Sequence, residues 1–188
     1  EVWVEPLDGS AGGWFYLGGA CISYVVWDPE HSTWCHGSRD VGLDIIRRFV
    51  PGKKTYIGQL EALAAAAVYY SLPSGVLKGR EVYHWIDNQS ALACFVKSYS
   101  GKQDKGRIIS AFAFRAAELG FKVWWEYVPS KQNVADLPSR DVEEAEGGLL
   151  SDMPGGASVR RPLVVPEFAE WDSQVGRVAG GPRRRRVH

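Results

Sequence analysis

The chain has 188 residues, of which 45% are hydrophobic and 12% aromatic. This composition excludes a disordered chain, and the length is enough to bury a sizeable core. The formal net charge is zero, so only local basic patches, not the overall charge, can indicate a nucleic-acid-binding protein.

The first part of the chain predicts three strands and a connection. Val2–Asp8 is strand-like, and Gly19–Trp27 is rich in residues that favour β-structure. A turn that contains Asp and Pro follows, so Ser32–Gly37 is expected to return as the second strand of a hairpin. Val41–Lys54 is interpreted as a connection with one short helical turn.

The middle of the chain predicts a long helix and a central strand. Thr55–Leu72 has the helical period and many alanines, with Thr55 as the expected N-cap. The strand that follows, Val82–Ile86, leads into a helix over Ala91–Tyr99. Alternate side chains of this strand share a face: Val82, His84 and Ile86 on one, and Tyr83, Trp85 and Asp87 on the other.

The next segment predicts a polar loop, a helix, a strand and a short helical turn. The loop is Ser100–Gly106, and the amphipathic helix Arg107–Leu119 is followed by Gly120 at the position where helices usually end. Phe121–Val128 is an aromatic-rich strand, and Asn133 is expected to cap a short helical turn that starts over Asn133–Asp136 and is limited by Pro138. Three tryptophans, Trp85, Trp124 and Trp125, are expected in the core.

Hairpin-forming strands followed by alternating strands and helices predict an α/β fold with a mixed five-stranded sheet and helices on both faces. This domain is expected to span residues 1–141. Residues 142–188 are rich in Gly and Pro and contain the run Arg183–Arg186, so they are interpreted as a linker and a partly disordered basic tail. An alternative is that Pro162–Trp171 packs onto the sheet as a brace.

Four acidic residues lie at the ends of these elements or on helices next to them. They are Asp8 after the first strand, Glu61 in the long helix, Asp87 after the central strand and Asp136 in the last turn. If they converge, their mutual repulsion favours a bound cation, and oxygen ligands select Mg²⁺ or Mn²⁺. Two such ions can activate a water and stabilise the leaving oxygen of a phosphodiester.

Several segments resemble the ribonuclease H domain of retroelement reverse transcriptases. They are LDGS at residues 7–10, YIGQLEALAAA at 56–66, WIDNQSAL at 85–92 and YVPSKQNVADLPSR at 127–140. The last segment is typical of the final helix of that family, and the acids follow the family's order of Asp, Glu, Asp and Asp. The resemblance covers about residues 1–141.

The resemblance implies a ribonuclease H-like fold and an endonuclease that hydrolyses the RNA strand of RNA–DNA hybrids. It assigns Asp8, Glu61, Asp87 and Asp136 as catalytic metal ligands for two Mg²⁺ or Mn²⁺ ions. In this scheme Asp8 and Asp87 contact both ions, while Glu61 and Asp136 each hold mainly one. The expected partners are the hybrid and the rest of a reverse transcriptase polyprotein, and the isolated domain is expected to be monomeric.

The sequence departs from the family's pattern in two places. Glu5 as well as Asp8 could supply the first ligand, because either could follow the first strand. Many members carry a His in the loop before the last Asp, whereas this loop has Tyr127 and Lys131 and no His. Two alternatives therefore stay open: a catalytically inactive binding or structural module, and another nuclease of the same fold.

Polar and basic side chains near these acids are candidates for contacts with the nucleic acid. Phosphates attract Lys and Arg, while amides and hydroxyls can recognise the 2′-hydroxyl of RNA. The candidates are Asn88, Gln89, Ser90, Lys102, Lys105, Lys131 and Arg140.

The three cysteines are odd in number and lack CxxC spacing, which favours free thiols in a reducing compartment. No apolar run reaches the roughly 18 residues that a membrane span needs, and no secretion signal is visible. We therefore expect an intracellular protein of the cytoplasm or nucleus that has no membrane partner.

Overall fold

The computed structural model describes residues 20–50, 56–136 and 157–167 of the chain. In these ranges the protein is an α/β structure of five strands and five α-helices, with two short 3-10 helices. The expected strand Val2–Asp8 and the N-cap Thr55 lie outside the described residues. Among the helices described, none combines the length and the hydropathy needed to cross a bilayer.

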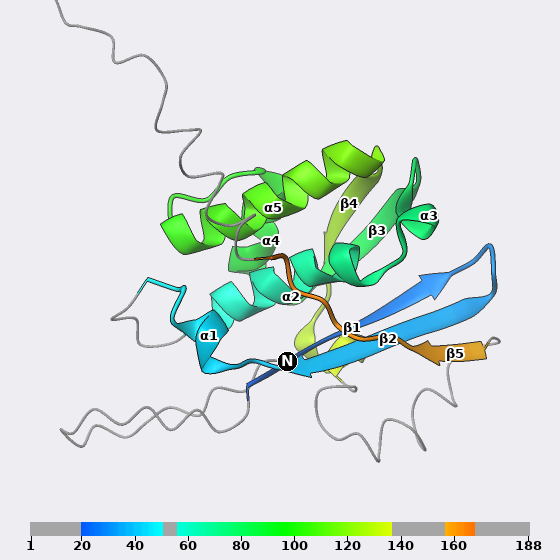
Figure 1. Ribbon diagram of the computed structural model, residues 1–188, viewed down its shortest axis with the longest axis horizontal. Helices are drawn as coiled ribbons and strands as arrows, with labels where there is room; N and C mark the ends of the chain where they lie inside the picture. The colour runs from blue at the N-terminus through cyan, green and yellow to red at the C-terminus, as the bar shows by residue number, and fades with distance from the viewer. Residues whose placement is uncertain (1–19, 51–55, 137–156, 168–188) are drawn as a thin grey trace, which may run out of the picture.

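The first sheet is built on the hairpin that the sequence predicts. Strand β1 (Cys21–Asp28) pairs antiparallel with β2 (Thr33–Asp40), and this confirms the predicted pair of strands. A third strand, β5 (Ala157–Arg160), adds to the other edge of β2 in parallel. The order β1-β2-β5 makes this a mixed three-stranded sheet (Figure 1).

The second sheet consists of two parallel strands, β3 (Glu81–Ile86) and β4 (Lys122–Tyr127). The described chain therefore has five strands in two sheets. Four of them were predicted and β5 was not, and because the expected strand Val2–Asp8 lies outside the described residues, the predicted single five-stranded sheet is not seen within them. The pairing of β3 with β4 continues past both ends, because Lys122 N donates to Arg80 O and Val128 N donates to Ile86 O.

Three helices pack on the strands and on one another. They are α2 (Ile57–Ser71), α4 (Gln89–Val96) and α5 (Gln103–Leu119), and α2 packs against both α5 and β1 (Figure 1). Two shorter helices, α1 (Leu43–Ile46) and α3 (Ser74–Leu77), flank α2. In the part of the chain described, no helix covers the outer face of β3 and β4, so the expectation of helices on both faces is not met there.

Two predicted helix starts are wrong. The residue that precedes the first turn of α2 is Tyr56, and its side chain makes no capping hydrogen bond. Helix α5 begins at Gln103, so part of the segment predicted as a polar loop is helical. The predicted end of α5 is confirmed, because Gly120 adopts the left-handed conformation, with φ of 67°.

An aromatic cluster fills the space between the helices and the second sheet. Trp125 packs on Phe95 with ring centroids 4.4 Å apart and on Phe112 at 5.1 Å. The prediction that this tryptophan lies in the core is therefore confirmed. The same prediction is wrong for Trp85 and Trp124, which are each 57% exposed on the outer face.

The segment from β5 to Glu167, here called the C-terminal strap, crosses from the first sheet to α2. Val164 N donates to Ser71 Oγ at the end of α2, and Leu163 is only 4% exposed. At Gly37 a side chain would collide with the carbonyl oxygen of Arg161, so only glycine lets the strap lie this close to β2. Residues 157–167 thus pack on the body of the molecule, while the rest of the segment of the brace alternative, residues 168–171, lies outside the described residues.

Candidate functional site

The carboxyl end of β3 is the centre of the candidate site. Ile86 is the last residue of the strand, and Asp87 follows it directly as a half-buried residue. Asn88 then caps α4, because its Oδ1 accepts a hydrogen bond from Ala91 N at 3.0 Å. This turn confirms the predicted arrangement in which a strand ends on an acid and a capped helix begins.

The segment that follows β4 returns to the same end of the sheet. Val128 N donates to Ile86 O at 3.2 Å, directly beside Asp87. Two 3-10 helices follow, η1 (Ser130–Gln132) and η2 (Val134–Asp136). The second is held to β1 by a hydrogen bond from Ser23 Oγ to Ala135 O.

The turn before η2 is also capped as predicted, since Asn133 Oδ1 accepts a hydrogen bond from Ala135 N at 3.1 Å. Asp136 therefore ends a capped turn that follows Val128 along the chain and is bonded to β1. The position of its side chain is outside the described part of the structure.

The first turns of α2 face the same region. A Cβ atom added to Gly58 would lie 4.0 Å from Asn88 Oδ1, so this part of α2 lies against the start of α4. Glu61 is half-buried and lies one helical turn after Gly58 on the same face. Glu61 thus belongs to the part of α2 that lies against the start of α4.

Two of the four predicted acids, Glu61 and Asp87, therefore belong to elements that pack together near the carboxyl end of β3, and a third, Asp136, belongs to η2, which is bonded to β1. The fourth, Asp8, and its rival Glu5 lie outside the described residues, as does Arg140. Asp87, Glu61 and Asp136 offer only oxygen donors, and such a set fits Mg²⁺ or Mn²⁺ better than softer metals. The chemistry of these side chains is thus compatible with the predicted ions.

Lys105 is the residue of the predicted binding set whose environment is most specific. The residue is 8% exposed, and its Nζ donates to Ser90 Oγ at 2.8 Å, in the first turn of α4. A Cβ atom on Gly58 would lie 2.8 Å from the same ammonium, so the glycine leaves the space that Lys105 occupies. A cation is thus held in the first turn of α4, beside Ser90.

A buried carboxylate fixes the helix that carries Lys105. Asp104 is 2% exposed, and its Oδ2 accepts hydrogen bonds from Gln59 Nε2 at 3.0 Å and from Val50 N at 3.3 Å. Its other oxygen accepts from Lys105 N at 2.9 Å. These bonds tie α5 to the start of α2 and so hold the elements of the site in a fixed relation.

The remaining members of the predicted nucleic-acid-binding set lie at the surface. Gln89 is exposed in the first turn of α4, and Lys102 is exposed immediately before α5. Lys131 is exposed in η1, on the segment that leads to Asp136. Their exposure leaves them accessible to a large ligand.

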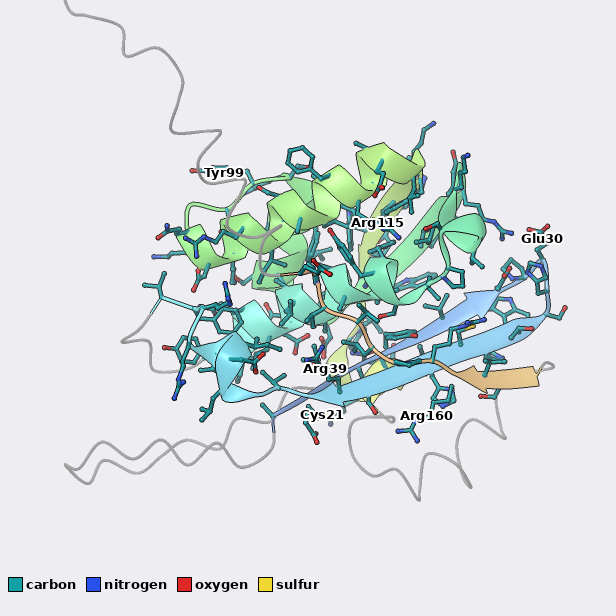
Figure 2. The ribbon with its side chains drawn as sticks, in the orientation of Figure 1. Cys21, Glu30, Arg39, Tyr99, Arg115 and Arg160 are labelled. Atoms are coloured by element: carbon teal, nitrogen blue, oxygen red, sulfur yellow. The ribbon has the colours of Figure 1, made fainter. Side chains whose placement is uncertain are left out.

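A second acidic group lies at the opposite end of β3. Asp28, Glu30 and His31 each offer a possible metal-ligand atom, and these atoms lie within 4.8 Å of one another. Figure 2 shows Glu30 at the hairpin turn, far along β1 from Cys21. The side chain of Arg80, directly before β3, contacts this group, with its guanidinium 3.2 Å from Asp28 and also paired with Glu30.

The Asp28 group is therefore best described as an ion-pair network. Desolvation by burial raises the pKa of Asp28. The net effect is still a pKa below the usual value, because Asp28 accepts hydrogen bonds from His31 and the Glu30 amide and lies beside Arg80. Arginine already supplies the positive charge that a metal would bring. Because β3 has six residues at roughly 3.3 Å each, this network lies about 20 Å from the Asp87 end.

Some residues of the site were not predicted from the sequence. Gly58 carries no local signal, because its importance comes from Lys105, which approaches it from another helix. Asp104 and Gln59 looked like ordinary polar residues, and only the tertiary structure brings their side chains together. A buried lysine in a polar segment likewise has no signature in the sequence.

Comparisons with models of protein families, with curated proteins and with solved structures found no match to this chain.

Proposed function

We propose that this chain is a ribonuclease H-type domain that hydrolyses the RNA strand of RNA–DNA hybrids. One observation carries the proposal: the first turns of α2, the helix that carries Glu61, lie against the start of α4, which directly follows Asp87 at the end of β3. Glu61, Asp87 and Asp136 follow one another along the chain in the order that the resemblance requires. The sequence resemblance over residues 1–141 supports the same function.

In this proposal Asp87 and Glu61 bind the catalytic ions, together with Asp136 and with Asp8 or Glu5. Bound Mg²⁺ or Mn²⁺ supplies an activated water and stabilises the charge on the leaving oxygen. The carboxylates of the chain hold the ions. The bonds made by Asp104 preserve the spacing between the helices, and such preorganisation is the usual contribution of a protein to this chemistry.

The substrate is held through its phosphates at the start of α4. The Lys105 ammonium has three N–H bonds, and Ser90 Oγ accepts one, so it can also donate to a phosphate oxygen. Asn88, whose Oδ1 caps α4, also has an amide group that can donate to a sugar hydroxyl. Exposed Gln89 and Lys131 extend this surface on either side.

The context proposed for the domain is a retroelement reverse transcriptase polyprotein, as the motif at residues 127–140 suggests. The loop before Asp136 lacks the His of many family members, so slow product release is expected rather than loss of metal binding. A catalytically inactive module is the second candidate, and this departure is the observation that favours it.

Cleavage of a labelled RNA–DNA hybrid in the presence of Mg²⁺, beside a duplex DNA control, tests the proposal. Cleavage of the RNA strand alone, abolished by Asp87→Asn and retained by Glu118→Gln, supports it. Glu118 is a suitable control, because it is an exposed acid near the far end of α5 and pairs only at the surface with Arg115. A folded, metal-binding protein without cleavage would instead identify an inactive module.

Two further variants identify the first ligand. Asp8→Asn is expected to abolish cleavage, while Glu5→Gln is expected to have a mild effect. The reverse order would show that Glu5 holds the metal. Cleavage of both strands or of duplex DNA would point to another nuclease of the same fold.

A further inference from the structure

The outer face of β3 and β4 is an exposed aromatic surface. Tyr83 is 60% exposed, and Trp85 and Trp124 are each 57% exposed. All three belong to the same face, because they alternate along their strands with the core residues. We call this surface the aromatic face; its members are Glu81, Tyr83, Trp85, Lys122, Trp124 and Glu126.

The rings of the aromatic face are neighbours rather than scattered residues. Tyr83 is paired in register with Trp124 across the two strands. Along β3 the rings of Tyr83 and Trp85 are stacked with centroids 6.4 Å apart and an angle of 27° between their planes. Single exposed aromatics are common, but three adjacent ones indicate a surface that binds something.

The charges around these rings favour a positively charged occupant. Glu126 is paired in register with Trp85, so a carboxylate lies beside the indole. Glu81 lies at the other end of the face, where Lys122 is its partner in register. The aromatic face thus carries two carboxylates and one ammonium, a balance that repels phosphate groups and attracts a cation to the ring faces.

Arginine is the cation that best suits such a face. Its planar guanidinium stacks on aromatic rings and can donate to a carboxylate at the same time, which lysine does less well. The chain itself contains the run Arg183–Arg186. Fifteen residues, Phe168–Pro182, connect this run to Glu167, the last described residue of the C-terminal strap.

This connection is long enough to reach around the molecule. Fifteen residues span up to about 50 Å when extended, whereas a domain of this size has a radius of gyration of roughly 14 Å. The strap fixes the start of the connection, because Pro166 is fully buried. A tether of this length gives an effective concentration in roughly the millimolar range, enough for a weak site to be occupied.

We propose that the aromatic face binds the arginine run at residues 183–186 of the same chain. The guanidinium groups stack on Trp85, Trp124 and Tyr83, and Glu126 accepts hydrogen bonds from them. This inference does not depend on the proposed nuclease activity, because it uses none of the acids at the end of β3. It gives the basic tail a protein partner in place of a nucleic acid.

The test uses the full chain with all four arginines, 183–186, replaced by glutamine, so that its face is vacant. A fluorescent peptide with the sequence of residues 176–188 is titrated into this protein, and its anisotropy is measured. We expect saturable binding that weakens as salt rises. The unaltered chain should bind the peptide several-fold more weakly, because its own run competes.

Matched variants in the glutamine background locate the site. Trp85→Ala combined with Trp124→Ala should weaken peptide binding by roughly tenfold, given the usual strength of cation–π contacts. The control pair is Tyr99→Ala with Phe114→Ala, which removes rings that are 67% and 54% exposed elsewhere and should leave binding unchanged. A peptide with lysine in place of arginine should bind more weakly.

Three results would overturn the proposal. The first is that the peptide does not bind to the chain with the four glutamines, or that it binds equally well when Trp85 and Trp124 are also replaced. The second is an oligonucleotide whose binding depends on Trp85 and Trp124, which would make the aromatic face a nucleic-acid surface. The third is self-association, measured by sedimentation, that the same substitutions abolish, which would make it an interface between two copies.

Discussion

The hydroxyl of Tyr69 lies 2.8 Å from Nδ1 of His84, in the layer between α2 and β3. Burial raises the pKa of Tyr69 and lowers that of His84 to about 4, so the hydroxyl stays protonated and donates to a neutral imidazole. Trp125 also packs against the imidazole, with ring centroids 4.8 Å apart. Protonation of Nδ1 would break the hydrogen bond from Tyr69 and place a positive charge in an aromatic core.

We therefore predict that the domain becomes less stable in mild acid. The unfolded chain protonates His84 near pH 6.5, whereas the folded chain does so only near pH 4, so the unfolded state binds more protons between these values. Stability from this group is complete above pH 6.5 and is lost as the pH falls towards 4. Urea unfolding should show a loss of about 2 kcal/mol between pH 7 and pH 5.

His84→Gln is the control for this effect. The variant should be less stable at pH 7, but its stability should change much less between pH 7 and pH 5. An unaltered pH dependence in the variant would assign the effect to another group.

The second prediction concerns the space around Lys105. Gly58→Ala adds a methyl group 2.8 Å from Nζ, so the ammonium must leave its position beside Ser90. We expect hybrid affinity to fall by roughly tenfold, the value of one charge-assisted hydrogen bond. Because alanine is a better helix former than glycine by about 1 kcal/mol, stability should hardly change.

Gly75→Ala is the matched substitution, since a Cβ atom there meets nothing within 4 Å. Hybrid affinity of this variant should equal that of the unaltered chain. Equal affinities for Gly58→Ala and Gly75→Ala would mean that Lys105 does not contact the substrate.

The third prediction separates the two acidic groups. Mg²⁺ at 100 times its dissociation constant should stabilise the folded protein by about 2.7 kcal/mol. Asp87→Asn should abolish this gain, whereas Asp28→Asn should retain it, because Arg80 already neutralises the Asp28 group. Thermal unfolding with and without Mg²⁺ measures both. A gain that disappears only in Asp28→Asn would place the metal at the hairpin.

The fourth prediction tests the C-terminal strap with two adjacent substitutions. Leu163→Ala should destabilise the protein by about 2–4 kcal/mol, because the side chain is 4% exposed. Val164→Ala should cost less than about 1 kcal/mol, since that side chain is 44% exposed and its backbone bond to Ser71 is kept. Equal small effects would show that the strap contributes little to the core.

Local patterns in the sequence were sufficient for most elements. The alternation of residues 81–86 predicts β3 and its two faces correctly, and the turn at Asp87 and Asn88 is visible because strand, acid and cap are adjacent. The alternation cannot show which face is covered. Trp85 and Trp124 look like core residues by type, yet only the partners of a face decide whether it is buried.

The features that were missed depend on contacts between distant segments. Asp104 and Lys105 lie in a stretch whose composition resembles a loop, and their burial depends on Gln59 and Ser90 from other helices. Strand β5 has no recognisable strand pattern in the sequence. Its four residues form a strand because they pair with β2. The sequence thus shows which acids are candidates, but not the contacts of Asp104 and Lys105 that hold the neighbouring helices in place.

The contact between Gly37 and the C-terminal strap also sets an order of events in folding. Strand β2 and the strap are separated by more than a hundred residues, and such a loop is slow to close. Until it closes, β2 is an unprotected edge that can pair with another chain. The Arg161 amide, which donates to His36 O at 2.8 Å, should therefore be among the last protected in pulse-labelled refolding. A chain still emerging from the ribosome would expose this edge until the strap is made, and a chaperone would be most useful in that interval.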